Sequence, residues 1–157
     1  MTYVPQIATQ PKIEHALRIA SKRTGADFDY LLKTAMRESS LNSQAKSNTS
    51  TAKGLFQFIE QTWLSTVKKA GHEFGLGHLS NMISRSSDGA FKVADPSRRS
   101  AILALRDDPQ TSALMAGAYA REAASELQAS FGRAPKKGEL YIAHFMGKKG
   151  AVRLISL

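Results

Sequence analysis

The chain has 157 residues, of which 42% are hydrophobic and 22% charged, so it is long enough for one domain with a buried core and too apolar to be disordered. It contains no cysteine, which excludes disulfide and thiolate chemistry. The formal net charge of +9 favours a polyanionic partner, which could be nucleic acid, an anionic membrane or an acidic wall polymer. The basic residues are scattered in pairs, as on a solvated surface, and no nucleic-acid-binding motif accompanies them.

The amino-terminal part of the chain predicts an extended start followed by two amphipathic helices. Residues 1–10 have neither the basic region nor the apolar region of an export signal, and we expect them to be extended. Apolar residues recur at helical spacing between Pro11 and Gly25. Asp27 has the position of an N-cap for a second helix, which carries apolar residues as far as Met36.

The middle of the chain alternates polar loops with short apolar segments. Residues 39–53 are too rich in serine, threonine and asparagine for a helix interior, and residues 54–59 read as a short apolar turn or strand. A helix is predicted at about 60–70, closed by Gly71. Residues 72–95 are the least regular part of the sequence, and a loop of this length inside a compact domain is usually functional or mobile.

Two Asp-Pro pairs, at 95–96 and 108–109, each indicate a helix that begins with an acidic N-cap. The second of these helices is the longest, at about 109–131. Its segment 113–120 is apolar on every side, so we expect it to run through the core.

Two further short helices, at about 138–146 and 150–156, complete the predicted fold. No repeat or linker divides the pattern, so residues 1–157 are expected to form a single, mainly α domain. No apolar run approaches the roughly 18 residues that span a bilayer, and no transmembrane segment is expected. The four histidines do not show metal-ligand spacing, so neither a metal site nor a cofactor is expected.

Glu38 stands at the end of the second predicted helix, on the edge of its buried face. Leu31, Ala35 and Glu38 fall at i, i+4 and i+7, which lie on one side of a helix. A carboxyl group in this position is partly removed from water, which raises its pKa and allows it to act as a general acid near neutral pH. A glutamate that only reaches into solvent from a helix end fits the same spacing.

The sequence around Glu38 carries a set of motifs with fixed spacing. Glu38-Ser-Ser-Leu-Asn ends the predicted helix, Ser47 follows nine positions after Glu38, and Ala52-Lys-Gly-Leu-Phe-Gln57 forms an apolar turn. This pattern resembles the signature of lytic transglycosylases of the soluble-transglycosylase and goose-type lysozyme-like superfamily. The resemblance implies a lysozyme-like single domain with a long buried central helix and a cleft formed by polar loops.

Two later segments agree with the same family and stand in the same order. The Asp108-Pro pair, with Gly117 and Tyr119 further on, is similar to the family's buried helix. Ala143-His-Phe-Met-Gly147 is similar to its Ala-Tyr-Asn-Ala-Gly motif. The resemblance therefore spans about residues 10–155.

The resemblance implies that Glu38 is the single catalytic acid and base. It places Ser47 in the cleft near the N-acetyl group of the substrate or near Glu38, and Gln57 on a sugar. The alternative is that Ser47 and Gln57 only bond loop backbone, as these residue types often do.

His144 departs from the family motif, because it replaces a tyrosine whose hydroxyl is thought to bond the catalytic glutamate. His144 either donates the same bond, or lowers the pKa of Glu38 when it is protonated, or is a core histidine. Tyr119 and Tyr141 are expected to be buried, with hydroxyl groups that could reach the cleft. Trp63 and the pair Phe56 and Phe58 are expected in the core.

The implied activity is cleavage of the MurNAc-β-1,4-GlcNAc bond of peptidoglycan without water, which leaves a 1,6-anhydroMurNAc end. An alternative is a hydrolytic muramidase of the same fold, in which a second acid positions water; the candidates for that acid are Glu60, Glu73, Asp88 and Asp95. A further alternative is an inactive protein that binds the cell wall or serves in assembly. A nucleic-acid partner rests on charge alone and is not expected.

The resemblance also implies a setting. The partner is the glycan strand of peptidoglycan, the location is the periplasm or cell envelope of a bacterium, and a cell-envelope apparatus is a further candidate partner. We expect a monomer.

Overall fold

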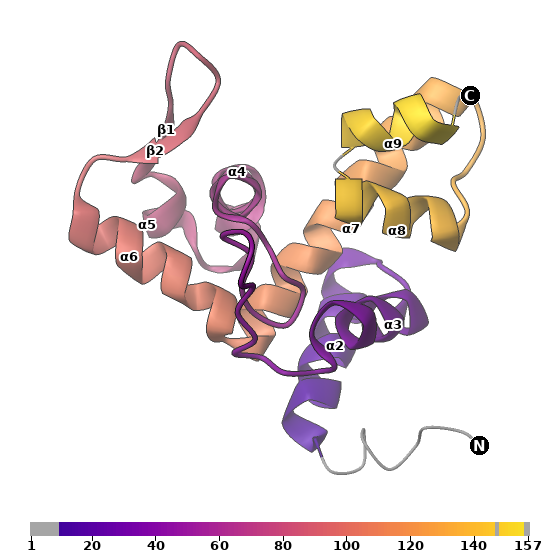
Figure 1. The fold of residues 1–157 in the computed structure, drawn as a ribbon, viewed down its shortest axis with the longest axis horizontal. Helices are drawn as coiled ribbons and strands as arrows, with labels where there is room; N and C mark the ends of the chain where they lie inside the picture. Colours follow the sequence, from indigo (N-terminus) through magenta and orange to yellow (C-terminus); the bar gives the residue numbers. More distant parts are fainter. Residues whose placement is uncertain (1–9, 147, 156–157) are drawn as a thin grey trace.

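The structure is a computed structural model that describes residues 10–146 and 148–155. It is mainly helical, and its elements are arranged around the long helix α7 (Pro109–Phe131), as Figure 1 shows. Every residue of α7 from Ser112 to Ala120 is buried, so the predicted central helix is confirmed. The expected extended segment 1–10 lies, except for Gln10, outside the described residues.

Two amino-terminal helices, α2 (Pro11–Thr24) and α3 (Phe28–Ser39), pack on one side of α7. The predicted cap of α3 is present, because the Asp27 side chain accepts a hydrogen bond from the Tyr30 amide at 2.9 Å. The contact between α2 and α7 is close. A Cβ added at Gly117 would lie 2.3 Å from the Thr24 hydroxyl oxygen, so only glycine fits there.

The other side of α7 is covered by a series of short elements. They are the helices α4 (Glu60–Ala70), η1 (Gly71–Phe74), α5 (Gly77–Ser80), α6 (Pro96–Ala104) and η2 (Leu105–Asp107), and the strands β1 (Ile83–Arg85) and β2 (Phe91–Val93). Both predicted Asp-Pro helix starts are confirmed, since Asp95 caps α6 and Asp108 caps α7. Trp63, Phe56 and Phe58 are buried, as predicted.

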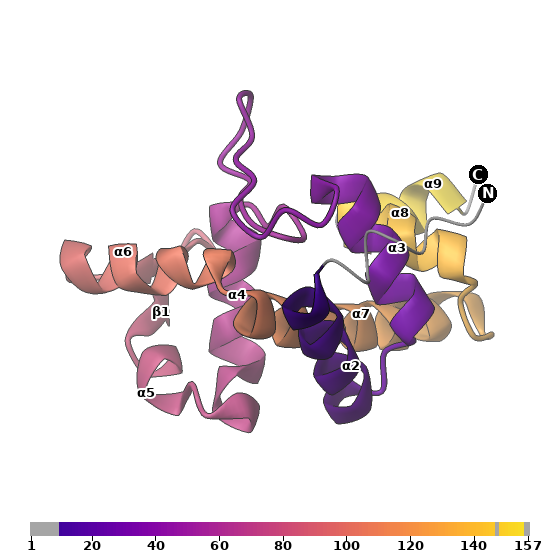
Figure 2. The same ribbon diagram turned by 90° about the horizontal axis from the view of Figure 1, so that it is seen from below.

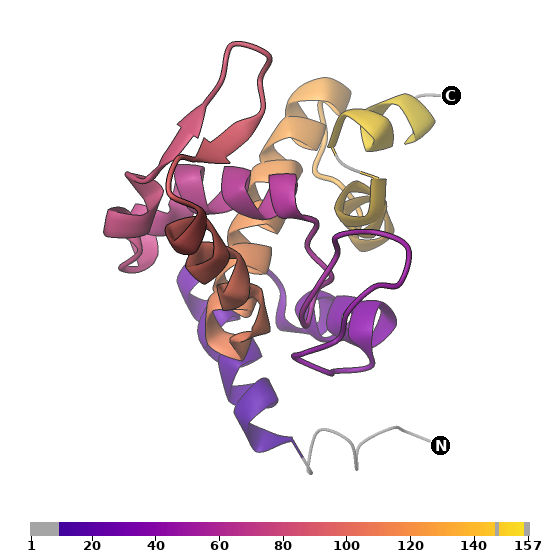
Figure 3. The same ribbon diagram turned by 60° about the vertical axis from the view of Figure 1, so that its left-hand side comes forward.

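The prediction that residues 72–95 form one irregular loop was wrong. The segment contains η1, α5 and a two-stranded antiparallel hairpin in which Ile83 pairs with Val93. The hairpin projects from the body of the protein (Figure 3) and is attached to α4 by Gln61, which bonds both the amide and the carbonyl of Phe91. The Asp88-Gly89 turn at its tip is a signal for a hairpin in the sequence.

Two carboxy-terminal helices, α8 (Lys137–Met146) and α9 (Lys148–Ile155), pack against each other and against α7. Both helices were predicted from the sequence. The predicted starts, at 138 and 150, lie one and two residues after the observed starts of α8 and α9. Ala123 and Leu127 of α7 form a small separate core with Ala143 and Ala151. No helix in residues 10–146 or 148–155 is long and apolar enough to cross a membrane.

The long connection between α3 and α4, residues 40–59, rises beyond the surrounding helices (Figure 2). It contains the predicted polar loop, apart from Ser39, and the apolar turn, and we call it the α3–α4 loop. This loop stands between the end of α3 and α8, so its conformation determines the geometry of the site described next.

Candidate active site

Glu38 lies one residue before the end of α3 and is half-buried. The helix stops because Ser40 and Leu41 adopt left-handed backbone conformations, with φ of 53° and 63°. The Ser39 hydroxyl lies 2.7 Å from the Leu55 carbonyl oxygen and ties the helix end to the α3–α4 loop. The carboxylate is therefore held beside this loop.

Backbone hydrogen bonds fold the α3–α4 loop onto itself. The Gly54 amide donates to the Ala45 carbonyl at 2.7 Å, and the Lys53 amide donates to the Phe58 carbonyl at 3.2 Å. Gln57 adopts a left-handed conformation with φ of 54°, which is costly for a residue with a side chain. In the described chain, the non-glycine residues with positive φ are Ser40, Leu41 and Gln57, which all lie in this loop. Strained backbone of this kind tends to cluster at functional sites.

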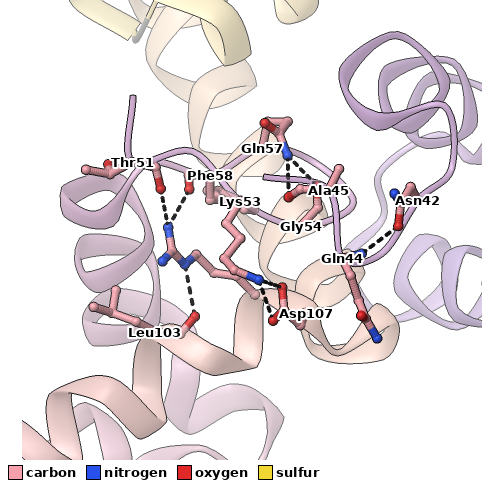
Figure 4. A network of polar contacts seen from close by, with 11 residues as sticks. Asn42, Gln44, Ala45, Thr51, Lys53, Gly54, Gln57, Phe58, Leu103 and Asp107 are labelled. Atoms are coloured by element: carbon pink, nitrogen blue, oxygen red, sulfur yellow. Dashed lines mark hydrogen bonds and ion pairs between the residues drawn. The ribbon is translucent and has the colours of Figure 1, made fainter. Parts of the chain in front are cut away.

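Arg106 and Asp107 of η2 bind the α3–α4 loop through hydrogen bonds and an ion pair. Arg106 is buried, and its Nη1 donates to the carbonyls of Thr51 at 2.7 Å and Phe58 at 3.0 Å. Lys53 forms an ion pair with Asp107 at 2.6 Å (Figure 4). These contacts could not be predicted from the sequence, because no local pattern indicates that an arginine between α6 and α7 reaches back to this loop.

The end of α3, the loop and α8 enclose a pocket of about 280 Å³, which we call the Glu38 pocket. Its wall includes Glu38, Ser47, Ser50, Gln57, Ile59 and His144. Four of the six site residues predicted from the sequence therefore meet at one pocket. Among the described residues that line it, Glu38 is the single carboxylate.

The environment of Glu38 favours its protonated form. Removal of the carboxyl group from water raises its pKa above the ordinary value, and a hydrogen bond from the Tyr141 side chain acts in the opposite direction. Tyr141 comes from α8, three residues before His144, so the two side chains lie on the same side of that helix. A carboxyl group under these opposed influences can exchange its proton in both directions.

Ser47 and Gln57 line the Glu38 pocket but also make the local bonds of the alternative interpretation. Ser47 Oγ accepts from the amides of Thr49 and Ser50, each at 3.2 Å. Gln57 Nε2 donates to the carbonyls of Ala45 at 3.0 Å and Gly54 at 2.9 Å. Ser47 Oγ also lies 3.4 Å from Thr49 Oγ1, so the group left for a ligand is the amide oxygen of Gln57.

His144 contacts the α3–α4 loop. Its Nε2 lies 2.8 Å from the Phe56 carbonyl oxygen, and because a carbonyl only accepts, Nε2 carries the hydrogen. Burial lowers the pKa of His144, which favours the neutral ring. The hydrogen bond that lowers the pKa of Glu38 comes from Tyr141, one turn before His144 on the same helix.

Tyr119 lies in α7 at the wall of an adjoining pocket of about 290 Å³, which shares Gln57, Ile59 and His144 with the Glu38 pocket. Tyr119 is 8% exposed, and its hydroxyl donates to the Ala143 carbonyl at 3.4 Å. This bond joins α7 to α8 and supports the helix that carries Tyr141 and His144. The prediction that Tyr119 is buried with its hydroxyl near the site agrees with this position.

The four carboxylates considered as a second acid do not line the Glu38 pocket, and each is bound by another group of the protein. Glu60 pairs with Arg99 at 3.0 Å, and Glu73 pairs with Arg121 at 2.8 Å. Asp88 accepts hydrogen bonds from Ser86 and Ala90 in the hairpin, and Asp95 caps α6. The hydrogen bonds to Glu73, Asp88 and Asp95 lower the pKa of each, which is opposite to the shift of Glu38. In the described part of the chain no three histidine, aspartate or glutamate side chains gather as metal ligands.

A mainly helical domain with a buried central helix, and with a half-buried glutamate facing a polar loop across a pocket, defines a lysozyme-like fold. Residues 15–89, a little under half of the chain, match the family model of the transglycosylase SLT domain, which is consistent with the lytic transglycosylase and lysozyme-like superfamily. The resemblance seen in the sequence is thus confirmed. Glu38, Ser47 and Gln57 lie inside the matched residues, whereas Tyr119, Tyr141 and His144 lie beyond them.

Proposed function

We propose that this protein cleaves the MurNAc-β-1,4-GlcNAc bond of peptidoglycan without water, with Glu38 as both acid and base. The SLT domain family supports a peptidoglycan transglycosylase function in general. The observation that carries the finer proposal is that Glu38 is the single carboxylate of its pocket and has a raised pKa.

The reaction can be written with Glu38 alone. The protonated carboxyl donates its hydrogen to the glycosidic oxygen, and the bond from that oxygen to C1 of MurNAc breaks, with the electron pair going to the oxygen. The carbonyl of the substrate's own N-acetyl group stabilises the positive C1. The Glu38 carboxylate then removes the hydrogen of the C6 hydroxyl, whose oxygen bonds C1 and closes the 1,6-anhydro ring. Glu38 ends protonated, and no water is consumed.

A second acid would be needed for ordinary hydrolysis, because most glycosidases place two carboxylates about 5–9.5 Å apart across the scissile bond. Glu60, Glu73, Asp88 and Asp95 are engaged in ion pairs, a turn or a helix cap, and none of the four lines the Glu38 pocket. These contacts favour the non-hydrolytic route over the muramidase alternative. The intact set of Glu38, Ser47 and Gln57 around one pocket favours an enzyme over an inactive wall-binding protein.

Mass spectrometry of the products tests the proposal. Purified peptidoglycan is digested with the protein, and the released muropeptides are analysed directly and after chemical reduction. Anhydro ends are one water molecule lighter than reducing ends and resist reduction. Reducing ends would establish the hydrolytic muramidase, and an undigested wall would indicate the inactive binding protein.

Replacing Tyr141 with phenylalanine should move the alkaline limb of the pH profile of kcat/KM to higher pH. The Tyr141 hydrogen bond lowers the pKa of Glu38, so its loss raises that pKa, and Glu38 stays protonated to higher pH. Initial rates across the pH range measure the limb. Tyr30→Phe is the matched control, because the Tyr30 hydroxyl donates to the Leu140 carbonyl at 3.2 Å. An unmoved limb in Tyr141→Phe would show that the bond does not tune the acid.

Replacing His144 with glutamine should leave the acid limb of the pH profile where it is in the wild type. Burial lowers the pKa of His144, so the ring stays neutral as the pH falls through the ordinary histidine range. Glutamine is neutral too and can donate to the Phe56 carbonyl in the same way. If the acid limb extends to lower pH in this variant, His144 becomes charged in the wild type and holds Glu38 ionised.

The proposed setting follows from the substrate. We propose glycan strands of peptidoglycan as the partner and the periplasm or cell envelope of a bacterium as the location, with a monomer as the active form. The net charge of +9 suits a wall whose stem peptides are anionic.

A further inference from the structure

A separate pocket of about 200 Å³ lies between α3 and the start of α8, and we call it the Arg37 pocket. Its wall includes Asp29, Tyr30, Lys33, Arg37, Lys137 and Tyr141. Tyr141 connects it to the Glu38 pocket, because the same side chain lines the Arg37 pocket and bonds Glu38. Two neighbouring residues of the chain, Arg37 and Glu38, thus belong to two different pockets joined by one tyrosine.

The Arg37 pocket is lined by three cationic side chains and one carboxylate. Lys33 pairs with Asp29 at 3.2 Å, and Lys137 lies 3.2 Å from Asp27 and 3.8 Å from Asp29. Arg37 instead lies over the ring of Tyr141, with its guanidinium carbon 4.8 Å from the ring centre. Among the ion pairs of the described residues none involves Arg37, so the pocket has a positive charge without a matching carboxylate.

The position of Arg37 over the Tyr141 ring suits a planar anion. A guanidinium stacked on an aromatic ring keeps its N–H groups at its edge, where two of them can bind both oxygens of one carboxylate. The lysines are about two-thirds exposed, at 66% for Lys33 and 63% for Lys137, so they can turn toward an anion at little cost. An uncharged sugar could accept hydrogen bonds here but would gain no net charge attraction.

The proposed substrate brings a carboxylate to this place. The scissile bond starts at C1 of MurNAc, and the stem peptide is attached through the lactyl group on O3 of the same sugar. The stem therefore leaves the glycan within one sugar ring of Glu38. Stem peptides carry free carboxylates, whereas the lactyl carboxyl group of each MurNAc is uncharged while it is bound in the amide to its stem.

We propose that the Arg37 pocket binds a carboxylate of the peptidoglycan stem peptide, with Arg37 as its main ligand and Lys33 and Lys137 as supporting charges. This inference rests on the proposed function and assigns the substrate class as glycan that carries stems. A carboxylate on Arg37 also holds the guanidinium on the Tyr141 ring, and so keeps the tyrosine hydroxyl on Glu38.

Two substrates separate the stem site from catalysis. Soluble glycan strands that carry stems are compared with strands from which an amidase has removed the stems and whose exposed lactyl carboxyl groups have then been converted to amides. KM and kcat are measured for both. The wild type should show a KM up to about fivefold lower with stems, since an exposed ion pair contributes up to about that factor. Arg37→Met and Lys33→Met should reduce this difference, with the larger loss in Arg37→Met.

Arg18→Met is the matched control. The Arg18 guanidinium lies 4.4 Å from the centre of the Phe28 ring, so this variant also loses one charge and one aromatic stack, but away from the pocket. It should keep the wild-type difference between the two substrates. Strands whose stem carboxylates have been converted to amides should behave as strands without stems.

Equal KM values of the wild type for both substrates would overturn the stem site and leave the proposed function standing. A difference that survives in Arg37→Met, or that persists with amidated stems, would overturn it as well. Failure of the wild type to cleave either substrate would overturn the proposed function together with the stem site.

Discussion

Glu38→Gln should lower the rate of peptidoglycan cleavage by about a thousandfold or more, because general acid–base catalysis by one group contributes about 10²–10⁴-fold and here one group does both steps. Glutamine has the same size and can still accept the Tyr141 hydrogen bond, so the pocket should keep its shape. Circular dichroism and muropeptide release from the same preparation measure fold and activity together.

The same variant should be at least as stable as the wild type at neutral pH. The folded state raises the pKa of Glu38, so ionising this group disfavours folding once the pH exceeds the ordinary glutamate pKa. A neutral glutamine avoids that cost, and the gain should disappear at acidic pH, where Glu38 is protonated in both folded and unfolded chains. Urea unfolding at pH 7 and at acidic pH measures the difference in free energy of unfolding.

Glu73→Gln is the matched control for catalysis. Glu73 was a candidate for a second acid, and the structure pairs it with Arg121 at 2.8 Å. We expect it to keep most of the activity. More than a few per cent of activity in Glu38→Gln, or loss of activity in Glu73→Gln, would show that the acid lies elsewhere.

The helical fold could be predicted because its signals are local. Asp27 and Asp108 cap helices whose apolar spacing is visible in the sequence, and the run 113–120 has no polar side to expose. Glu38 could be predicted for the same reason, since its place on the buried edge of α3 follows from helix periodicity and from a motif of adjacent residues.

The contacts of the site could not be predicted in this way, because they join distant parts of the chain. Tyr141 bonds Glu38, whereas the family motif directed attention to His144, one turn further along α8. Arg106 contacts loop carbonyls about fifty residues earlier in the chain. A pattern of residue types specifies which face of a helix is buried, but not which side chain of a neighbouring helix reaches it.

Gly54→Ala should destabilise the protein by about 3 kcal/mol or more, which is the second large effect that we expect. Gly54 has a φ of 86°, and a Cβ there would lie 2.0 Å from the Arg106 carbonyl oxygen and 2.9 Å from its carbon. Neither the α3–α4 loop at Gly54 nor η2 at Arg106 can move away easily. The Arg106 side chain bonds the loop at Thr51 and Phe58, and Lys53 pairs with Asp107 next to it.

Gly25→Ala separates the steric effect from the backbone strain. Gly25 has nearly the same φ, 82°, but a Cβ there would have no atom within 4 Å. It should therefore lose only about 1–2 kcal/mol, the cost of a left-handed conformation for a residue with a side chain. Urea unfolding gives the free energy of unfolding of each variant. Equal losses of stability in the two variants would mean that η2 moves to accommodate the added methyl group. Because Ser47 and Gln57 lie on the loop that Gly54 fits against η2, Gly54→Ala should also lower kcat/KM under conditions where it is folded, whereas Gly25→Ala should not.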